Sequence, residues 1–105
     1  MLHIHDVMLD VISTMQSMIR AIERRDRDLA SQLKRAASSV VLNLAEGSGS
    51  FGGVRTQRYR TALGSARETM SCLLVAERFG YVEAMSPALV TRMNRVIGTL
   101  VRVAC

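Results

Sequence analysis

The chain has 105 residues, a formal net charge of +5 and a pI of about 10.2. This length suits a single domain spanning residues 1–105. No stretch reaches the roughly 18 consecutive apolar residues that a membrane-spanning helix needs, and the first residues, MLHIHDVMLD, lack the basic and apolar regions of a secretory signal. We therefore expect a cytoplasmic protein with no membrane partner.

Apolar residues make up 49% of the sequence, but aromatic residues only 4%. The core must therefore be built from Leu, Val, Ile, Met and Ala, most of which lose little rotamer freedom in a helix. So much apolar material in a short chain exceeds what one small core can bury, and this indicates self-association.

Four segments carry apolar residues at spacings of three and four, which predicts helices at about residues 4–24, 28–46, 54–79 and 87–103. Asp26 or Asp28 is expected to cap the second helix, and Ser86 followed by Pro87 marks the start of the fourth. Leu74 is placed on the apolar stripe of the third helix and is therefore expected to lie in the core. Short connections between amphipathic helices predict an all-α fold, an up-down-up-down antiparallel four-helix bundle.

The second and third helices are expected to form the closest contact. Gly47 follows the second helix and is expected to end it in the left-handed conformation. Gly64 interrupts the third helix at a cost of about 1 kcal/mol, which predicts a close backbone approach there. If the hairpin turns at Gly52, facing residues have numbers that sum to about 104. The motif residues that this pairing brings together are Ala36, Ser39, Asn43, Glu46 and Gly47 on one side and Gly64, Ser65 and Glu68 on the other.

Within this pairing, Glu46 should face Arg58 and Asn43 should face Thr61. Ser39 should face Ser65. Arg35 or Ala36 should lie opposite Glu68.

The segment Gly47-Ser48-Gly49-Ser50-Phe51-Gly52 matches G-x-G-x-x-G, a pattern found in dinucleotide-binding sites. Such a site needs a strand before the first glycine, whereas a long helix precedes this one. The segment is therefore interpreted as a flexible turn. His3 and His5 point in different directions on a helix, and Cys72 and Cys105 have no metal-site spacing, so we expect no metal and no cofactor.

Basic residues are almost all arginine, since Lys34 is the only lysine. The guanidinium group forms bidentate pairs with phosphate, which favours a polyanion partner; a merely solvated basic surface is the alternative. Between Gly47 and Arg67 there are four Arg and no acidic residue. Tyr59, the aromatic residue among these arginines, lies on the apolar stripe and is assigned to the core. The candidate nucleic-acid-binding residues are Arg24, Arg25, Lys34, Arg35, Arg55, Arg58 and Arg60.

Three segments, LKRAASSVVLNLAEGSG, RYRTALGSARET and AERFGY, resemble the four-helix-bundle family of 23S rRNA intervening-sequence proteins. That family has Arg-Ala-Ala and Ser before Asn-Ile-Ala-Glu-Gly, then Gly-Ser and Glu in the next helix. Here Leu44 replaces the usual Ile, and the usual Arg after the glycine loop is shifted to Arg55. The other matching positions are Ala36, Ala37, Ser39, Asn43, Ala45, Glu46, Gly47, Gly64, Ser65 and Glu68.

The family is similar to the accessory variability determinant of diversity-generating retroelements, a pentameric, basic barrel that binds nucleic acid and a reverse transcriptase. The resemblance implies a homopentamer of four-helix bundles with RNA or DNA as a partner. It implies no known activity.

Two functions remain open: an accessory protein that binds nucleic acid, and a self-assembling scaffold that binds only itself or other proteins. Enzymatic activity is not expected. Beyond His5 there is no histidine, so acid–base chemistry would fall to Glu46 and Glu68, which have structural explanations.

Overall fold

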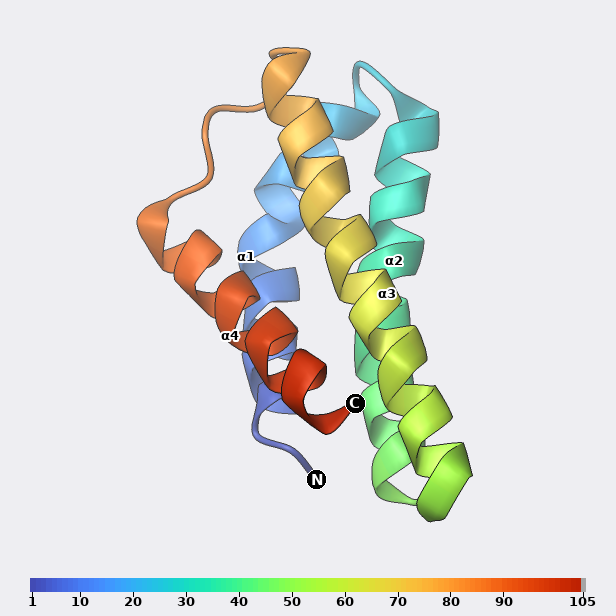
Figure 1. Cartoon of the computed structure of the whole chain (residues 1–105). Helices are drawn as coiled ribbons and strands as arrows, with labels where there is room; N and C mark the ends of the chain where they lie inside the picture. Colours follow the sequence, from blue (N-terminus) through green and yellow to red (C-terminus); the bar gives the residue numbers. More distant parts are fainter. Residues whose placement is uncertain (105) are drawn as a thin grey trace.

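The structure, a computed structural model, describes residues 1–104, and Cys105 lies outside this range. Within it the chain forms helices and no strands: α1 (Ile4–Glu23), α2 (Arg27–Ser48), α3 (Gly52–Arg78) and α4 (Pro87–Val103). The chain reverses direction at each connection, and α4 is the shortest helix (Figure 1). None of these helices is long and apolar enough to cross a membrane.

Side-chain caps fix where two of the helices begin. At the start of α2, Asp26 Oδ1 accepts a hydrogen bond of 3.0 Å from the backbone N–H of Leu29, so Asp26 and not Asp28 is the cap. At the start of α4, Ser86 Oγ accepts from the N–H of Leu89 at 3.2 Å, with Pro87 in the first turn. Both caps satisfy N–H groups that have no partner within the helix.

The core contains the apolar stripes of all four helices, with Met8, Met15, Leu33 and Leu100 fully buried. On α3, however, the buried face includes Thr69 and Cys72, while Leu74 is 41% exposed. Its assignment to the core was wrong because successive residues turn by about 100°, so Leu74 cannot share the direction of its buried neighbour Leu73.

Gly47 does not end the second helix, contrary to the sequence prediction. It lies inside α2, which continues to Ser48, and it is buried. The left-handed glycines among residues 1–104 are instead Gly52 (φ +55°) and Gly80 (φ +75°). Gly47 is needed for space: a Cβ atom there would overlap the Tyr59 ring, at 2.8 Å from Cδ1.

Gly64 does not mark a close approach, which corrects a second prediction. No atom lies within 4 Å of the position that a Cβ would occupy, and the residue is exposed. The small residues Ala62 and Ala66 face the core in its place. The close approach between α2 and α3 is therefore made by Gly47 against Tyr59.

Most of the glycine-rich segment belongs to the two helices, and the connection between them is short. Only Gly49, Ser50 and Phe51 lie between α2 and α3, because the flanking glycines belong to the helices. Ser50 Oγ donates a hydrogen bond of 2.8 Å to the carbonyl of Glu46, which satisfies one of the last carbonyl groups of α2.

Candidate nucleic-acid interface

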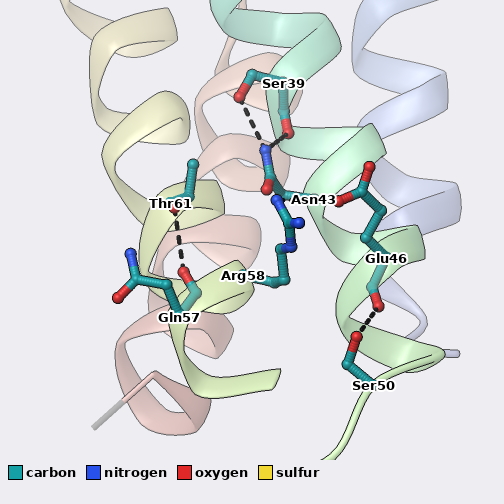
Figure 2. A network of polar contacts seen from close by, with 7 residues as sticks. All are labelled: Ser39, Asn43, Glu46, Ser50, Gln57, Arg58 and Thr61. Atoms are coloured by element: carbon teal, nitrogen blue, oxygen red, sulfur yellow. Dashed lines mark hydrogen bonds and ion pairs between the residues drawn. The ribbon is translucent and has the colours of Figure 1, made fainter. Parts of the chain in front are cut away.

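The α2–α3 hairpin has the predicted register. Ser65 Oγ donates a hydrogen bond of 2.7 Å to Ser39 Oγ, and Arg58 Nη1 lies 3.0 Å from Glu46 Oε2. Asn43 Nδ2 donates to the carbonyl and the hydroxyl oxygen of Ser39, at 2.9 and 3.1 Å, and so joins this seam (Figure 2). The two helices are thereby linked at two levels by polar groups that face each other.

The two other expected pairs do not form polar contacts. Thr61 Oγ1 donates to the carbonyl of Gln57 at 3.1 Å instead of meeting Asn43 (Figure 2). A helical threonine reaches the carbonyl four residues earlier without any tertiary partner, which accounts for this outcome. Within residues 1–104, Glu68 forms neither an ion pair nor a hydrogen bond, and Arg35 Nη1 donates to Ser31 Oγ at 2.8 Å.

Along this seam runs an open groove of about 440 Å³, which we call the hairpin groove. It brings together three of the candidate cations, Lys34 and Arg35 from α2 and Arg58 from α3. Arg35 and Glu46 are separated by about 17 Å along α2, at 1.5 Å per residue, so the cations lie near the two ends of the groove. The full lining is Lys34, Arg35, Ser38, Ser39, Leu42, Asn43, Glu46 and Arg58.

The two ion pairs formed by the cations of the hairpin groove are exposed. Lys34 Nζ lies 3.3 Å from Glu23 Oε2, and the side chains of Arg58 and Glu46 are 47% and 56% exposed. Exposed ion pairs contribute about 0–1 kcal/mol each, so a phosphate group can replace the carboxylate at little cost. The groove can therefore bind a polyanion through Lys34, Arg35 and Arg58.

The other four candidates lie elsewhere. Arg24 and Arg25 are exposed at the turn between α1 and α2. Arg55 Nε donates to the carbonyl of Gly47 at 3.2 Å, and Arg60 Nε donates to the carbonyl of Ala104 at 3.1 Å. A cation at the C-terminal end of a helix stabilises the last carbonyl groups, so Arg55 and Arg60 also serve α2 and α4 structurally.

Sequence reasoning missed Ser38 and Leu42, which also line the groove. Leu42 is 61% exposed although it is a large apolar residue. The spacing could have identified both residues as neighbours of Arg35. Positions 35, 38 and 42 follow each other at intervals of three and four and therefore share one helical face.

No group of three or more His, Cys, Asp or Glu residues within positions 1–104 could hold a metal ion. Cys72 is 5% exposed, and burial, followed by the nearby carboxylate of Glu68, raises the pKa of its thiol. A thiol with a raised pKa forms less of the nucleophilic thiolate, so Cys72 is suited to packing and not to catalysis.

Cys72 should accordingly react slowly with a thiol reagent. In a Cys105→Ser variant at pH 8, we expect modification at least about tenfold slower in the folded than in the denatured protein. The Cys72 thiol has a higher pKa in the folded protein than in the unfolded chain. The protonated thiol therefore contributes to the free energy of unfolding below about pH 8.5, and this contribution is lost as the pH rises above that value. Equal rates in both states would contradict the buried placement.

The fold agrees with the comparisons with known proteins. The family described as 23S rRNA-intervening sequence protein matches residues 4–101, and the chain belongs to this family. A crystal structure of a protein with unknown function from the S23 ribosomal protein family of Bacteroides thetaiotaomicron superposes with a TM-score of 0.80. It is 15% identical, with 96% of this chain and 97% of that chain covered, so the likeness concerns the fold alone. No curated protein matches this chain.

Proposed function

We propose that this protein is a non-enzymatic, homo-oligomeric accessory protein that binds RNA without sequence specificity through the hairpin groove. The observation that supports this most is the convergence of Lys34, Arg35 and Arg58, from two helices, on one open surface. The family name refers to an intervening sequence in 23S rRNA, which favours RNA over DNA as the nucleic acid.

The proposed mechanism is electrostatic. Cationic side chains that contact phosphates release the counterions condensed on the nucleic acid, and this favourable term carries no sequence information. The uncharged groove residues Ser38, Ser39 and Asn43 offer hydroxyl and amide groups that can hydrogen-bond to phosphate or sugar. Glu46, an acid–base candidate on sequence grounds, is instead paired with Arg58, which supports a role in binding over a role in catalysis.

Self-association is part of the proposal, with the homopentamer implied by the family resemblance. Large apolar side chains lie exposed on several helices of the protomer, and contact between copies would remove them from water. Several grooves on one particle would also raise the affinity for a long RNA by avidity. In the cytoplasm such a particle would present RNA to a further protein, of which a reverse transcriptase is one example. The exposed apolar residues outside the groove include Leu9, Leu74 and Val75.

A scaffold without a nucleic-acid role is the second candidate, and the scattered placement of Arg24, Arg25 and Arg60 away from the groove favours it. Light scattering combined with RNA binding at a series of salt concentrations separates the two. The RNA-binding protein should show an affinity that falls steeply between 50 and 200 mM salt, on the order of tenfold or more. An oligomer with no measurable RNA affinity even at low salt would favour the scaffold.

Glu46→Gln should strengthen RNA binding. The substitution removes a negative charge from the groove and the carboxylate with which a phosphate competes for Arg58. An exposed ion pair contributes about 0–1 kcal/mol, so the affinity should rise by up to about fivefold. Glu68→Gln is the matched control, because it removes the same charge from an exposed α3 residue outside the groove. An equal gain in both variants would assign the effect to net charge alone.

A further inference from the structure

We propose that Phe51, at the tip of the α2–α3 hairpin, is a stacking platform for an unpaired base of single-stranded RNA. The inference rests on the proposed function and extends it, because it assigns the single strand as the form of RNA and a second contact site beyond the hairpin groove.

Phe51 is the most exposed large apolar residue of the described chain, with 83% of its surface accessible. The sequence contains only two phenylalanines, so the placement of one of them entirely outside the core is notable for a protein short of aromatic residues. The segment that carries it is not a long disordered loop, since it connects two helices through Gly49, Ser50 and Phe51 alone. An aromatic ring on a short connection between two helices is a suitable platform for stacking.

Arg55 fixes the environment of this ring. Its guanidinium carbon lies 5.7 Å from the centroid of Phe51, and its Nε donates to the carbonyl of Gly47 at 3.2 Å. The guanidinium group is therefore held at the ring by a backbone contact. Nucleic-acid-binding proteins combine aromatic faces with such cations, because a base stacks on the ring while the adjacent phosphate meets the positive charge.

The surrounding charge favours a polyanion over another copy of this chain. Residues 47–67 contain four arginines and no acid, so two hairpin tips would repel each other. Arg58, at the end of the hairpin groove, follows Arg55 by about one turn of α3. A strand whose phosphates lie in the groove can therefore continue past Arg58 to the tip.

The single strand follows from the geometry of stacking. In a duplex each base is already covered above and below by its neighbours, and an external ring meets only backbone and groove edges. Single-stranded RNA can turn a base outward to stack on an exposed aromatic ring, at a low cost in unstacking.

The test compares Phe51→Ala with Phe79→Ala, which removes the other exposed phenylalanine, 66% exposed, from the far end of α3. Three probes of equal length are used: oligouridine, the same backbone without bases, and a duplex RNA. We expect Phe51→Ala to weaken oligouridine binding about five- to 100-fold and to leave the other two affinities unchanged. Phe51→Tyr should retain the affinity, and Phe79→Ala should match the original protein. Circular dichroism verifies that each variant is folded.

Three outcomes would overturn the inference. Unchanged oligouridine binding by Phe51→Ala would show that no base stacks on the ring. If all three probes still bind with the expected salt dependence, the proposed function would hold and only the stacking of a base on Phe51 would be wrong. An equal loss for the base-free backbone would assign Phe51 to general packing. A change in oligomer mass on light scattering in the absence of RNA would make the tip a contact between copies. If the original protein binds none of the three probes, the proposed RNA-binding function itself is wrong.

Discussion

Gly47→Ala should lower the free energy of unfolding by about 1–3 kcal/mol, as overpacking of a filled interior does. The added methyl group would overlap the ring of Tyr59, which is only 7% exposed. Relief would require a shift of α2 relative to α3, which would also lengthen the hydrogen bond between Ser39 and Ser65. Denaturant unfolding followed by circular dichroism measures the change.

Gly64→Ala is the matched control, with the opposite sign. This glycine is in the interior of a helix, is exposed and has nothing within 4 Å of the future Cβ. Alanine should therefore raise the stability by about 0.5–1 kcal/mol through helix propensity alone. If Gly47→Ala is as stable as the original protein, or Gly64→Ala is strongly destabilised as a monomer, the packing of the hairpin described above is wrong.

The second large effect is expected from the charges of the groove. Replacing Lys34, Arg35 and Arg58 together with glutamine removes three phosphate contacts per groove. With a salt dependence of about 0.7 per contact for a single strand, the affinity for RNA should fall by about 100-fold at 0.1 M salt. The side chains are exposed, so the folded structure should persist. Fluorescence anisotropy with a labelled RNA measures the loss.

A second triple variant controls for net charge. Replacing Arg92, Arg95 and Arg102 with glutamine removes the same three charges from exposed positions of α4. This variant should lose only the weak, long-range part of the attraction, which is largely screened at 0.1 M salt. Comparable losses in both triple variants would mean that the groove has no special part in binding.

The register of the hairpin could be predicted from sequence, whereas the roles of its glycines could not. Counting outward from Gly52 placed Ser39 opposite Ser65 and Glu46 opposite Arg58, because a short connection between straight helices leaves little freedom of register. A glycine costs the same intrinsic propensity wherever it lies in a helix. Which one makes room for a neighbour depends on the tertiary position of a large side chain, here Tyr59.

The candidate interface was predictable only in part, for a related reason. Lys34 and Arg35 are adjacent on one helix, and the hairpin register places Arg58 on the same side. Arg60 is only two residues from Arg58, yet it bonds to the carbonyl of Ala104, which caps the end of α4. A helix turns by about 200° over two residues, so arginines that form one cluster in the sequence serve different surfaces in the fold.

If the hairpin groove holds RNA by its phosphates, binding must depend on salt through Lys34, Arg35 and Arg58. The most direct test is the slope of the logarithm of RNA affinity against the logarithm of salt concentration for the original protein and the two triple variants. We predict that the Lys34, Arg35 and Arg58 variant has a slope shallower by about 2 for a single-stranded RNA, and that the α4 variant keeps the original slope. Equal slopes for the original protein and the groove variant would contradict the account.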